Sequence, residues 1–111
     1  MTSSATPTEM TFFARFEADI LAGKKTITIR DEAESHYVPG SIVTVSTLEA
    51  GRVFCQLRIL NVDAVLCSEL NDFHAEQENM TLPQLQSVIQ EIYPNIEQLY
   101  VIHYQLISTS N

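Results

Sequence analysis

The residues whose types and spacing could support catalysis lie in the segment 23–30, which reads Gly-Lys-Lys-Thr-Ile-Thr-Ile-Arg. It combines a hydroxyl group on Thr28 with two adjacent lysines and an arginine. A threonine hydroxyl is a weak nucleophile unless a neighbouring base takes its proton, and Lys25 could be that base if its amine were neutral. The segment also fits a basic turn that leads into an edge strand, because clustered charges usually face solvent. Spacing alone leaves both interpretations open.

The nucleophile interpretation places a geometric condition on Lys25. Residues 26–30 alternate between polar side chains and isoleucine, which predicts a strand with the two isoleucines on one face and Thr28 and Arg30 on the other. Strict alternation would put Lys25 on the isoleucine face, so it must lie in the turn before the strand begins. Its pKa must also fall from about 10.4 to about 7–8, which burial and the charges of Lys24 and Arg30 would favour.

A second polar cluster occupies residues 74–79 and contains His74, Glu76 and Glu78. Its His-x-Glu pattern resembles the first half of a zinc deaminase signature, but the cysteine pair that completes the signature should follow, and both cysteines of this chain precede it. A catalytic zinc needs three protein ligands, so we expect no metal site. The simplest interpretation of His74 is a capping or surface residue of a helix. For the two glutamates, a solvated acidic face and a catalytic carboxyl group both stay open.

Hydrophobic periodicity predicts the elements that must position these groups. The predicted elements are helices at 12–22, within 68–79 and at 82–92, and strands at 26–30, 42–48, 53–62 and 99–107. Gly23 ends the first helix, and Thr81 begins the last one with a capping box. The strand at 99–107 is apolar on both faces, which is typical of a strand inside a sheet or barrel. Together these elements predict an α+β fold: a small, mostly antiparallel β-barrel with two to three flanking helices.

The composition is that of a globular protein, with 111 residues, 45% hydrophobic residues and 18% charged residues. This length allows one domain, which we place at residues 10–107 after a flexible N-terminal tail at 1–9. No apolar run approaches the roughly 18 residues that span a bilayer, and no signal-peptide pattern is present, so we expect a cytoplasmic protein without a membrane partner. Cys55 and Cys67 are expected to be reduced.

The charge balance restricts the choice of partners. A formal net charge of −8 argues against long RNA or DNA, because nucleic-acid affinity comes largely from cationic contacts with phosphates. Yet four of the six Lys and Arg residues, namely Arg15, Lys24, Lys25 and Arg30, lie close together in the sequence. A local positive patch on an acidic protein suits a small ligand or a catalytic site.

The spacing Gly23-x-Lys25 followed by Arg30 resembles the Gly-x-Lys-x-x-Glu-x-Arg motif of the ASCH domains, which are similar to the PUA family of RNA-associated barrels. The chain departs from this motif at Thr28, where most ASCH domains have Glu. That departure resembles a smaller bacterial subfamily of similar length, the N4-acetylcytidine amidohydrolases. Further similar blocks lie at residues 11–13, 19–23, 25–31, 74–80, 92–94 and 100–102. The resemblance covers residues 10–107, which we therefore expect to be a single ASCH-like catalytic domain.

The resemblance implies hydrolysis of N4-acetylcytidine to cytidine and acetate. It implies that Lys25 is the proton acceptor, Thr28 the nucleophile and Glu78 the proton donor, which favours the catalytic interpretation of both clusters. The expected partner is a small acetylated nucleoside, and no cofactor is expected. We also expect the protein to be a monomer.

Two alternatives accompany this interpretation. Arg30 either orients the substrate and stabilises charge in the transition state, or forms a structural ion pair with Asp31 or Glu32. The PUA-like resemblance also fits a non-catalytic module that binds RNA, although the acidic net charge disfavours it. Within the amidohydrolase interpretation, another acylated amine is a possible main substrate, because the motif specifies the chemistry more firmly than the acyl group.

Overall fold

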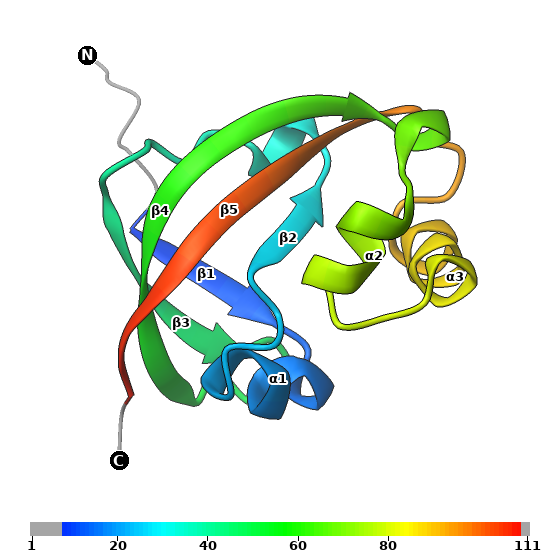
Figure 1. Ribbon diagram of the computed structural model, residues 1–111. Coiled ribbons are helices and arrows are strands. Elements are labelled where there is room, and N and C mark those ends of the chain that lie inside the picture. Colours follow the sequence, from blue (N-terminus) through cyan, green and yellow to red (C-terminus); the bar gives the residue numbers. More distant parts are fainter. Residues whose placement is uncertain (1–7, 110–111) are drawn as a thin grey trace.

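The computed structural model describes residues 8–109, which contain five strands and three α-helices (Figure 1). The strands are β1 (Glu9–Phe12), β2 (Ile27–Arg30), β3 (Ile42–Thr47), β4 (Val53–Leu66) and β5 (Gln98–Thr109). The α-helices are α1 (Glu17–Leu21), α2 (Asp72–Gln77) and α3 (Leu82–Ile92), and one-turn 3-10 helices lie at η1 (Ala14–Phe16), η2 (Glu32–Glu34) and η3 (Cys67–Glu69). None of the helices in this range is long and apolar enough to cross a membrane.

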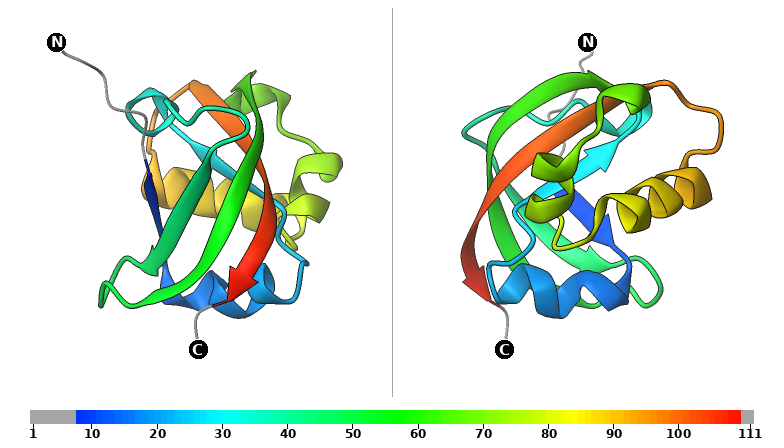
Figure 2. Two further views of the ribbon diagram at one scale, coloured as in Figure 1. Left: turned by 90° about the vertical axis from the view of Figure 1, so that its left-hand side faces the viewer. Right: turned by 45° about the vertical axis from the view of Figure 1, so that its right-hand side comes forward.

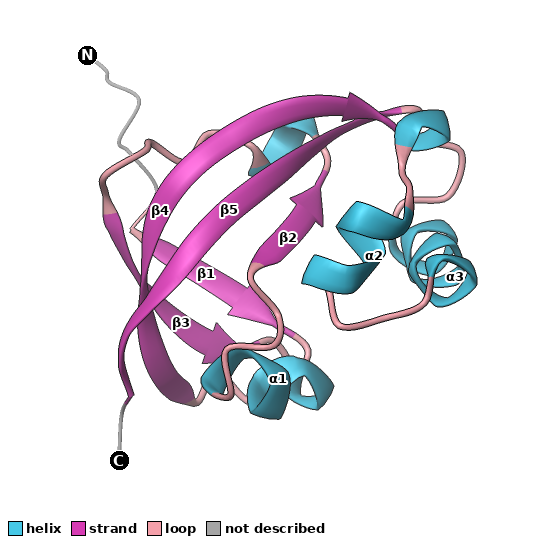
Figure 3. Ribbon diagram, in the orientation of Figure 1, coloured by secondary structure: helices cyan, strands magenta, loops and turns pink. Residues whose placement is uncertain are grey.

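All five strands belong to one sheet, in the order β1-β3-β4-β5-β2. β1 runs parallel to β3 and the other neighbouring pairs are antiparallel, so the predicted α+β fold with mostly antiparallel strands is confirmed. β4 and β5 are the longest strands, with 14 and 12 residues, and their register shifts between Ile59 and Asn61. Such a bulge bends a strand and increases its twist. Figure 3 shows the result, with β4 and β5 arching over β1 and β2.

The curved sheet does not close into a barrel, and this detail of the sequence-based prediction is not confirmed. β1 and β2 are the two edges of the sheet, and they do not pair with each other within residues 8–109. Each has only four residues, which is too short to cover the long arch of β4 and β5. The side chain of Arg30 on β2 bridges the edges instead, because it donates to the backbone carbonyl of Thr11 on β1. Side chains therefore line the seam between the edges.

Two apolar clusters build the core. The first lies among β1, β3, β4 and α1, and the second lies between the β2–β5 pair and the helices α2 and α3. β5 contributes to both, with Ile102 in the first cluster and Val101 in the second, which confirms that it is apolar on both faces. Ile27 and Ile29 of β2 both belong to the second cluster, as their alternation predicts. In Figure 2, α2 and α3 lie together on one side of the sheet, and α1 crosses one end.

Most predicted elements are confirmed near their expected bounds. The hairpin forms from β3 and β4, a short helix within 68–79 is α2, and α3 has the predicted bounds. At the start of α3, the Thr81 hydroxyl accepts a hydrogen bond from the N–H group of Gln84, and the Gln84 side chain accepts one from Thr81. Cys55 and Cys67 carry free thiols.

The prediction for the N-terminal region is partly wrong. The helix expected at 12–22 begins later, with η1 at Ala14 and α1 at Glu17, because Phe12 belongs to β1 and packs in the core. β1 is the element that periodicity missed, since four residues give too short a pattern without their partner strand β3. Residues 1–7 of the expected flexible tail lie outside the described residues, and Glu9 begins β1.

Candidate active site

The turn between α1 and β2 places Lys25 just outside the regular strand. Gly23 follows the end of α1 with a φ of 75°, a left-handed conformation that glycine adopts without steric penalty. The backbone N–H groups of Lys24 and Lys25 donate to the carbonyl oxygen of Asp19 at 2.9 and 3.1 Å. β2 begins only at Ile27, so Lys25 meets the condition that the nucleophile interpretation places on it.

Glu78 reaches the same place from the C-terminal end of α2. Its backbone N–H donates to the carbonyl oxygen of His74 at 3.0 Å, in the last turn of the helix. A 2.8 Å hydrogen bond from the N–H of Thr26 to the carbonyl oxygen of Gln77 joins this end of α2 to the start of β2. Lys25 Nζ and Glu78 Oε1 form an ion pair, and their side chains are only 3% and 5% exposed. The fold thus buries two opposite charges against each other.

Burial and the charge of Arg30 favour the neutral form of Lys25, whereas the Glu78 carboxylate and two aromatic rings favour its charged form. Its Nζ lies 5.6 Å from the ring centre of Phe12 and 5.0 Å from that of Phe16. Burial, followed by the positive charge of Arg30, lowers the pKa of Lys25 from 10.5 to about 7, while the negative charge of Asp19 acts in the opposite direction. An amine with this pKa can accept a proton near neutral pH, as a general base must.

Thr28 and Arg30 extend from β2 on the face opposite the isoleucines, and both are buried. The Nε group of Arg30 donates to Thr28 Oγ1 at 2.8 Å, and its Nη2 group donates to the carbonyl oxygen of Thr11 at 2.7 Å. The guanidinium carbon lies 4.9 Å from the ring centre of Phe12. Arg30 therefore supports the seam of the sheet and also directs a positive charge at the Thr28 oxygen.

The ion-pair partner of Arg30 differs from the sequence-based expectation. Arg30 Nη1 pairs with Glu34 Oε2 at 3.7 Å, and the ion pair with Asp31 or Glu32, which the sequence left as one alternative, does not form among the described residues. The one-turn helix η2 folds the chain back so that Glu34, at its end, faces Arg30. The Tyr93 hydroxyl donates to Glu34 Oε1 at 2.5 Å and fixes this carboxylate in place.

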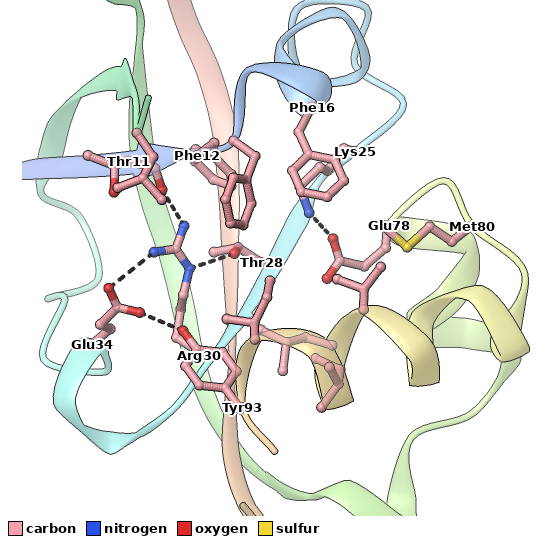
Figure 4. A pocket seen from close by; sticks show the side chains of 16 residues that line it. Thr11, Phe12, Phe16, Lys25, Thr28, Arg30, Glu34, Glu78, Met80 and Tyr93 are labelled. Carbon is pink, nitrogen blue, oxygen red and sulfur yellow. Dashed lines mark hydrogen bonds and ion pairs between the residues drawn. The ribbon is translucent and has the colours of Figure 1, made fainter. Parts of the chain in front are cut away.

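These side chains surround one pocket of about 190 Å³ between β1, β2 and α3 (Figure 4). Figure 4 shows Thr28 between the Lys25–Glu78 pair and the group formed by Arg30 and Glu34. The complete lining consists of Thr11, Phe12, Phe13, Phe16, Lys25, Thr28, Ile29, Arg30, Glu34, Leu48, Glu78, Met80, Val88, Ile89, Ile92 and Tyr93. The structure thus brings all four sequence-predicted site residues to one mostly apolar cavity.

The two polar groups of the pocket are hydrogen-bonded separately. Lys25 Nζ donates to Glu78 Oε1 and, at 3.0 Å, to the carbonyl oxygen of Ile27. Thr28 Oγ1 accepts from Arg30, and no hydrogen bond joins it to Lys25 among the described residues. Among the described residues, the Thr28 hydroxyl therefore accepts one hydrogen bond and donates none.

Sequence reasoning missed several residues that shape the site. Phe12 and Phe16 lie beside Lys25, Glu34 pairs with Arg30, and Tyr93 donates a hydrogen bond to Glu34. The spacing of Glu34, four positions after Arg30, could have indicated an ion pair between them. The aromatic residues have no feature in the sequence, beyond their hydrophobicity, that indicates a place in the site. The interpretation of His74 as a capping residue is confirmed, because its Nδ1 accepts a hydrogen bond from the N–H group that precedes α2.

The chain closely resembles curated enzymes along nearly its whole length. It is 76% identical over 99 residues to the N(4)-acetylcytidine amidohydrolase of Vibrio vulnificus strain YJ016, covering 89% of this chain and 95% of the relative. It is 65% identical over 101 residues to the enzyme of the same name from Vibrio atlanticus strain LGP32, covering 91% and 97%. The corresponding protein of Shewanella sp. strain W3-18-1 is 62% identical over 96 residues, covering 86% and 93%.

Solved structures give the fold. An ASCH domain from Lactobacillus crispatus JV V101 matches with a TM-score of 0.71 at 16% identity, covering 92% of this chain and 82% of that one. ASCH from Zymomonas mobilis matches with a TM-score of 0.70 at 13% identity, covering 92% and 71%. No protein-family model matches the chain. With an ASCH-like fold and relatives at this level of identity, the chain belongs to the N(4)-acetylcytidine amidohydrolase family, whose members are enzymes that hydrolyse an amide C–N bond.

Proposed function

We propose that this protein hydrolyses N4-acetylcytidine to cytidine and acetate, with Lys25 as the base, Thr28 as the nucleophile and Glu78 as the proton donor. The relatives carry this activity in their name, at up to 76% identity. The observation that carries the assignment of roles is a buried lysine, with a pKa lowered to about 7, in the same pocket as a threonine hydroxyl and a buried carboxyl group. We further propose that the enzyme acts in the cytoplasm, as a monomer and without a cofactor.

In the first step, the neutral amine of Lys25 accepts the hydroxyl proton of Thr28 while Oγ1 attacks the acetyl carbonyl carbon. Lys25 must exchange its contact with the carbonyl oxygen of Ile27 for one with Thr28. The Nε group of Arg30, which already donates to Oγ1, stabilises negative charge as it develops on that side of the pocket. The product of this step is a tetrahedral intermediate on Thr28.

In the second step, the bond between the acetyl carbon and the cytidine nitrogen breaks. Protonated Glu78 delivers a proton to the departing amine or ring nitrogen, without which an amide nitrogen leaves poorly. Cytidine departs and an acetyl ester remains on Thr28. Lys25 is then protonated and Glu78 ionised, so the Glu78 carboxylate accepts a proton as water attacks this ester. Protonated Lys25 returns its proton to Thr28 Oγ1 as the ester bond breaks, and acetic acid leaves and ionises to acetate in solution.

The mechanism requires the proton shared by the Lys25–Glu78 pair to be on Glu78, so that Lys25 is neutral. A neutral Lys25 with a protonated Glu78 has the same total number of protons as the ion pair, so the two states interconvert without any exchange with solvent. An ionised Glu78 in contact with Nζ favours the charged amine, whereas burial of the pair favours the neutral form of both groups. A substrate that fills the pocket excludes water and shifts the balance toward the neutral pair.

The test is cytidine release from N4-acetylcytidine by the wild type and by Lys25→Ala, Thr28→Ala and Glu78→Ala. We expect turnover in the wild type and a loss of about 10³-fold or more in each variant. Thr28→Ser is the matched control, since it keeps a hydroxyl and should retain measurable activity. Full activity in Thr28→Ala would contradict the nucleophile, and an inactive wild type would contradict the function. If another acylated amine is the main substrate, its kcat/KM will exceed that of N4-acetylcytidine.

A further inference from the structure

An open groove of about 550 Å³ lies next to the active-site pocket, and we name it the α1–α3 groove. Its lining consists of Arg15, Phe16, Asp19, Asn79, Met80, Pro83, Gln84, Ser87 and Val88. Three of these residues, Phe16, Met80 and Val88, also line the pocket, so the two spaces share a wall. The pocket itself is smaller than the range of about 300–1,000 Å³ that is typical for ligands of drug size. A whole nucleoside therefore needs more space than the pocket provides.

The proposed mechanism fixes which part of the substrate points toward this groove. The acetyl carbon must meet Thr28, and the departing nitrogen must lie next to Glu78. In cytidine the sugar is attached at N1, across the ring from the carbon that bears the acylated nitrogen, so it points away from Thr28. Figure 4 shows Phe16 and Met80 beside the Lys25–Glu78 pair, and both residues also line the groove.

Two polar side chains face each other across the α1–α3 groove. Asn79 Nδ2 donates to Asp19 Oδ1 at 3.1 Å, which links α1 to the segment after α2. Within residues 8–109, the other carboxylate oxygen of Asp19 has no hydrogen-bond donor. A carboxylate accepts hydrogen bonds only, and ribose offers two neighbouring hydroxyl donors, a pairing that also occurs in dinucleotide-binding folds.

Both groups are rigidly connected to the catalytic residues. The backbone carbonyl of Asp19 holds the N–H group of Lys25, as described above, and Asn79 directly follows Glu78. Asn79 has a φ of 59°, and its N–H group donates to the carbonyl oxygen of Glu76 at 3.0 Å. Backbone hydrogen bonds therefore fix where the chain at Asp19 and Asn79 lies relative to the catalytic pair.

We propose that the α1–α3 groove binds the ribose of the substrate, with Asp19 accepting hydrogen bonds from its 2′- and 3′-hydroxyl groups. This inference rests on the proposed function and adds a second subsite to it. It assigns recognition of the base and acyl group to the pocket and recognition of the sugar to the groove.

The test compares N4-acetylcytidine with N4-acetylcytosine, which lacks the sugar, in the wild type and in Asp19→Asn. In Asp19→Asn, the amide oxygen of the new side chain can still accept the hydrogen bond from Asn79. Its NH2 group, which only donates, replaces the free carboxylate oxygen. We expect kcat/KM for the nucleoside to fall about tenfold relative to that for the base. Asp19 also influences Lys25, but that influence acts equally on both substrates and cancels in the ratio. Asp63→Asn, on the exposed part of β4, is the matched control and should leave the ratio unchanged.

An unchanged ratio in Asp19→Asn would overturn the ribose subsite while leaving the proposed function intact. If the wild type hydrolyses neither substrate, the proposed function fails, and calorimetric titration with cytidine and cytosine tests the subsite separately. In that titration the subsite predicts tighter binding of cytidine by the wild type and a loss of this preference in Asp19→Asn. Equal affinities for cytidine and cytosine in the wild type would overturn it.

Discussion

Within residues 8–109, two ion pairs connect the N-terminal part of the chain to the helices that follow β4, and they differ in burial. Lys25–Glu78 joins the start of β2 to the end of α2, with exposed fractions of 3% and 5%. Arg15–Glu91 joins η1 to α3 at 3.4 Å, with exposed fractions of 51% and 64%. Each pair brings together a basic and an acidic side chain from distant parts of the sequence. The pairs differ in exposure to solvent and also in the basic group, which is an amine in one and a guanidinium in the other.

This difference in burial gives the two ion pairs different chemical properties. Water surrounds both charges of Arg15–Glu91 and screens them from each other, so their mutual attraction is weak. Around Lys25, the loss of water lowers the pKa of the amine to about 7, which makes its proton mobile under physiological conditions. Catalysis is therefore expected from the first pair and only a small contribution to stability from the second.

The largest expected effect concerns turnover. Glu78→Gln removes the acidic proton that the departing nitrogen needs but keeps the shape of the side chain, and we expect kcat to fall by about 10²–10⁴-fold. Glu91→Gln makes the same change in the exposed pair and should leave kcat within about twofold of the wild type. Initial rates of cytidine release measure both. Equal losses in the two variants would break the contrast between the pairs.

The next effect concerns the free energy of unfolding. Lys25→Ala leaves Glu78 buried without a partner and should lower this free energy by about 3–5 kcal/mol, whereas Arg15→Ala should lower it by about 0–1 kcal/mol. Denaturant titration followed by circular dichroism gives both values. The double variant Lys25→Met with Glu78→Leu removes both buried charges and should recover most of the loss. A double variant as unstable as Lys25→Ala would show that packing, and not the unpaired charge, determines the result.

A smaller effect is expected in the pH dependence of the reaction. Lys25 acts as a base only when neutral, so kcat/KM should fall as the pH drops below about 7, by roughly tenfold per pH unit. Arg30→Gln removes a positive charge that lowers the pKa of Lys25, so this pKa should rise and the acidic limb should move to higher pH. A pH–rate profile of each protein measures the midpoint. A midpoint that moves to lower pH in Arg30→Gln would contradict the proposed base.

The smallest effect is the coupling energy of the exposed pair. A double-mutant cycle with Arg15→Ala and Glu91→Ala should give about 0.2–1 kcal/mol at low salt, and the value should approach zero near about 0.5 M NaCl. The same salt should change the coupling between Lys25 and Glu78 far less, because buried charges are screened weakly. A coupling of Arg15 and Glu91 that persists at high salt would show that this pair is less solvated than its exposure indicates.

Local patterns predicted much of the scaffold. The capping box at Thr81 and the apolar stripe that follows it predicted α3, and the alternation in residues 26–30 predicted which side chains of β2 face the core. The turn at Gly23 predicted where α1 ends. β1 was missed because a four-residue strand depends on pairing with β3, and the expected barrel was not confirmed because closure depends on how the short edges meet.

The sequence by itself determined the residues of the candidate site and their family, through the motif at 23–30 with Thr28 in place of Glu and through the block that contains Glu78. Only the tertiary structure decided that Lys25 and Glu78, 53 positions apart, are buried against each other, and that Arg30 pairs with Glu34 and bridges the open seam. The physical reason is that the pKa of a side chain depends on solvent exclusion and on nearby charges. Both arise from elements that meet only when the sheet curves and the helices pack against it.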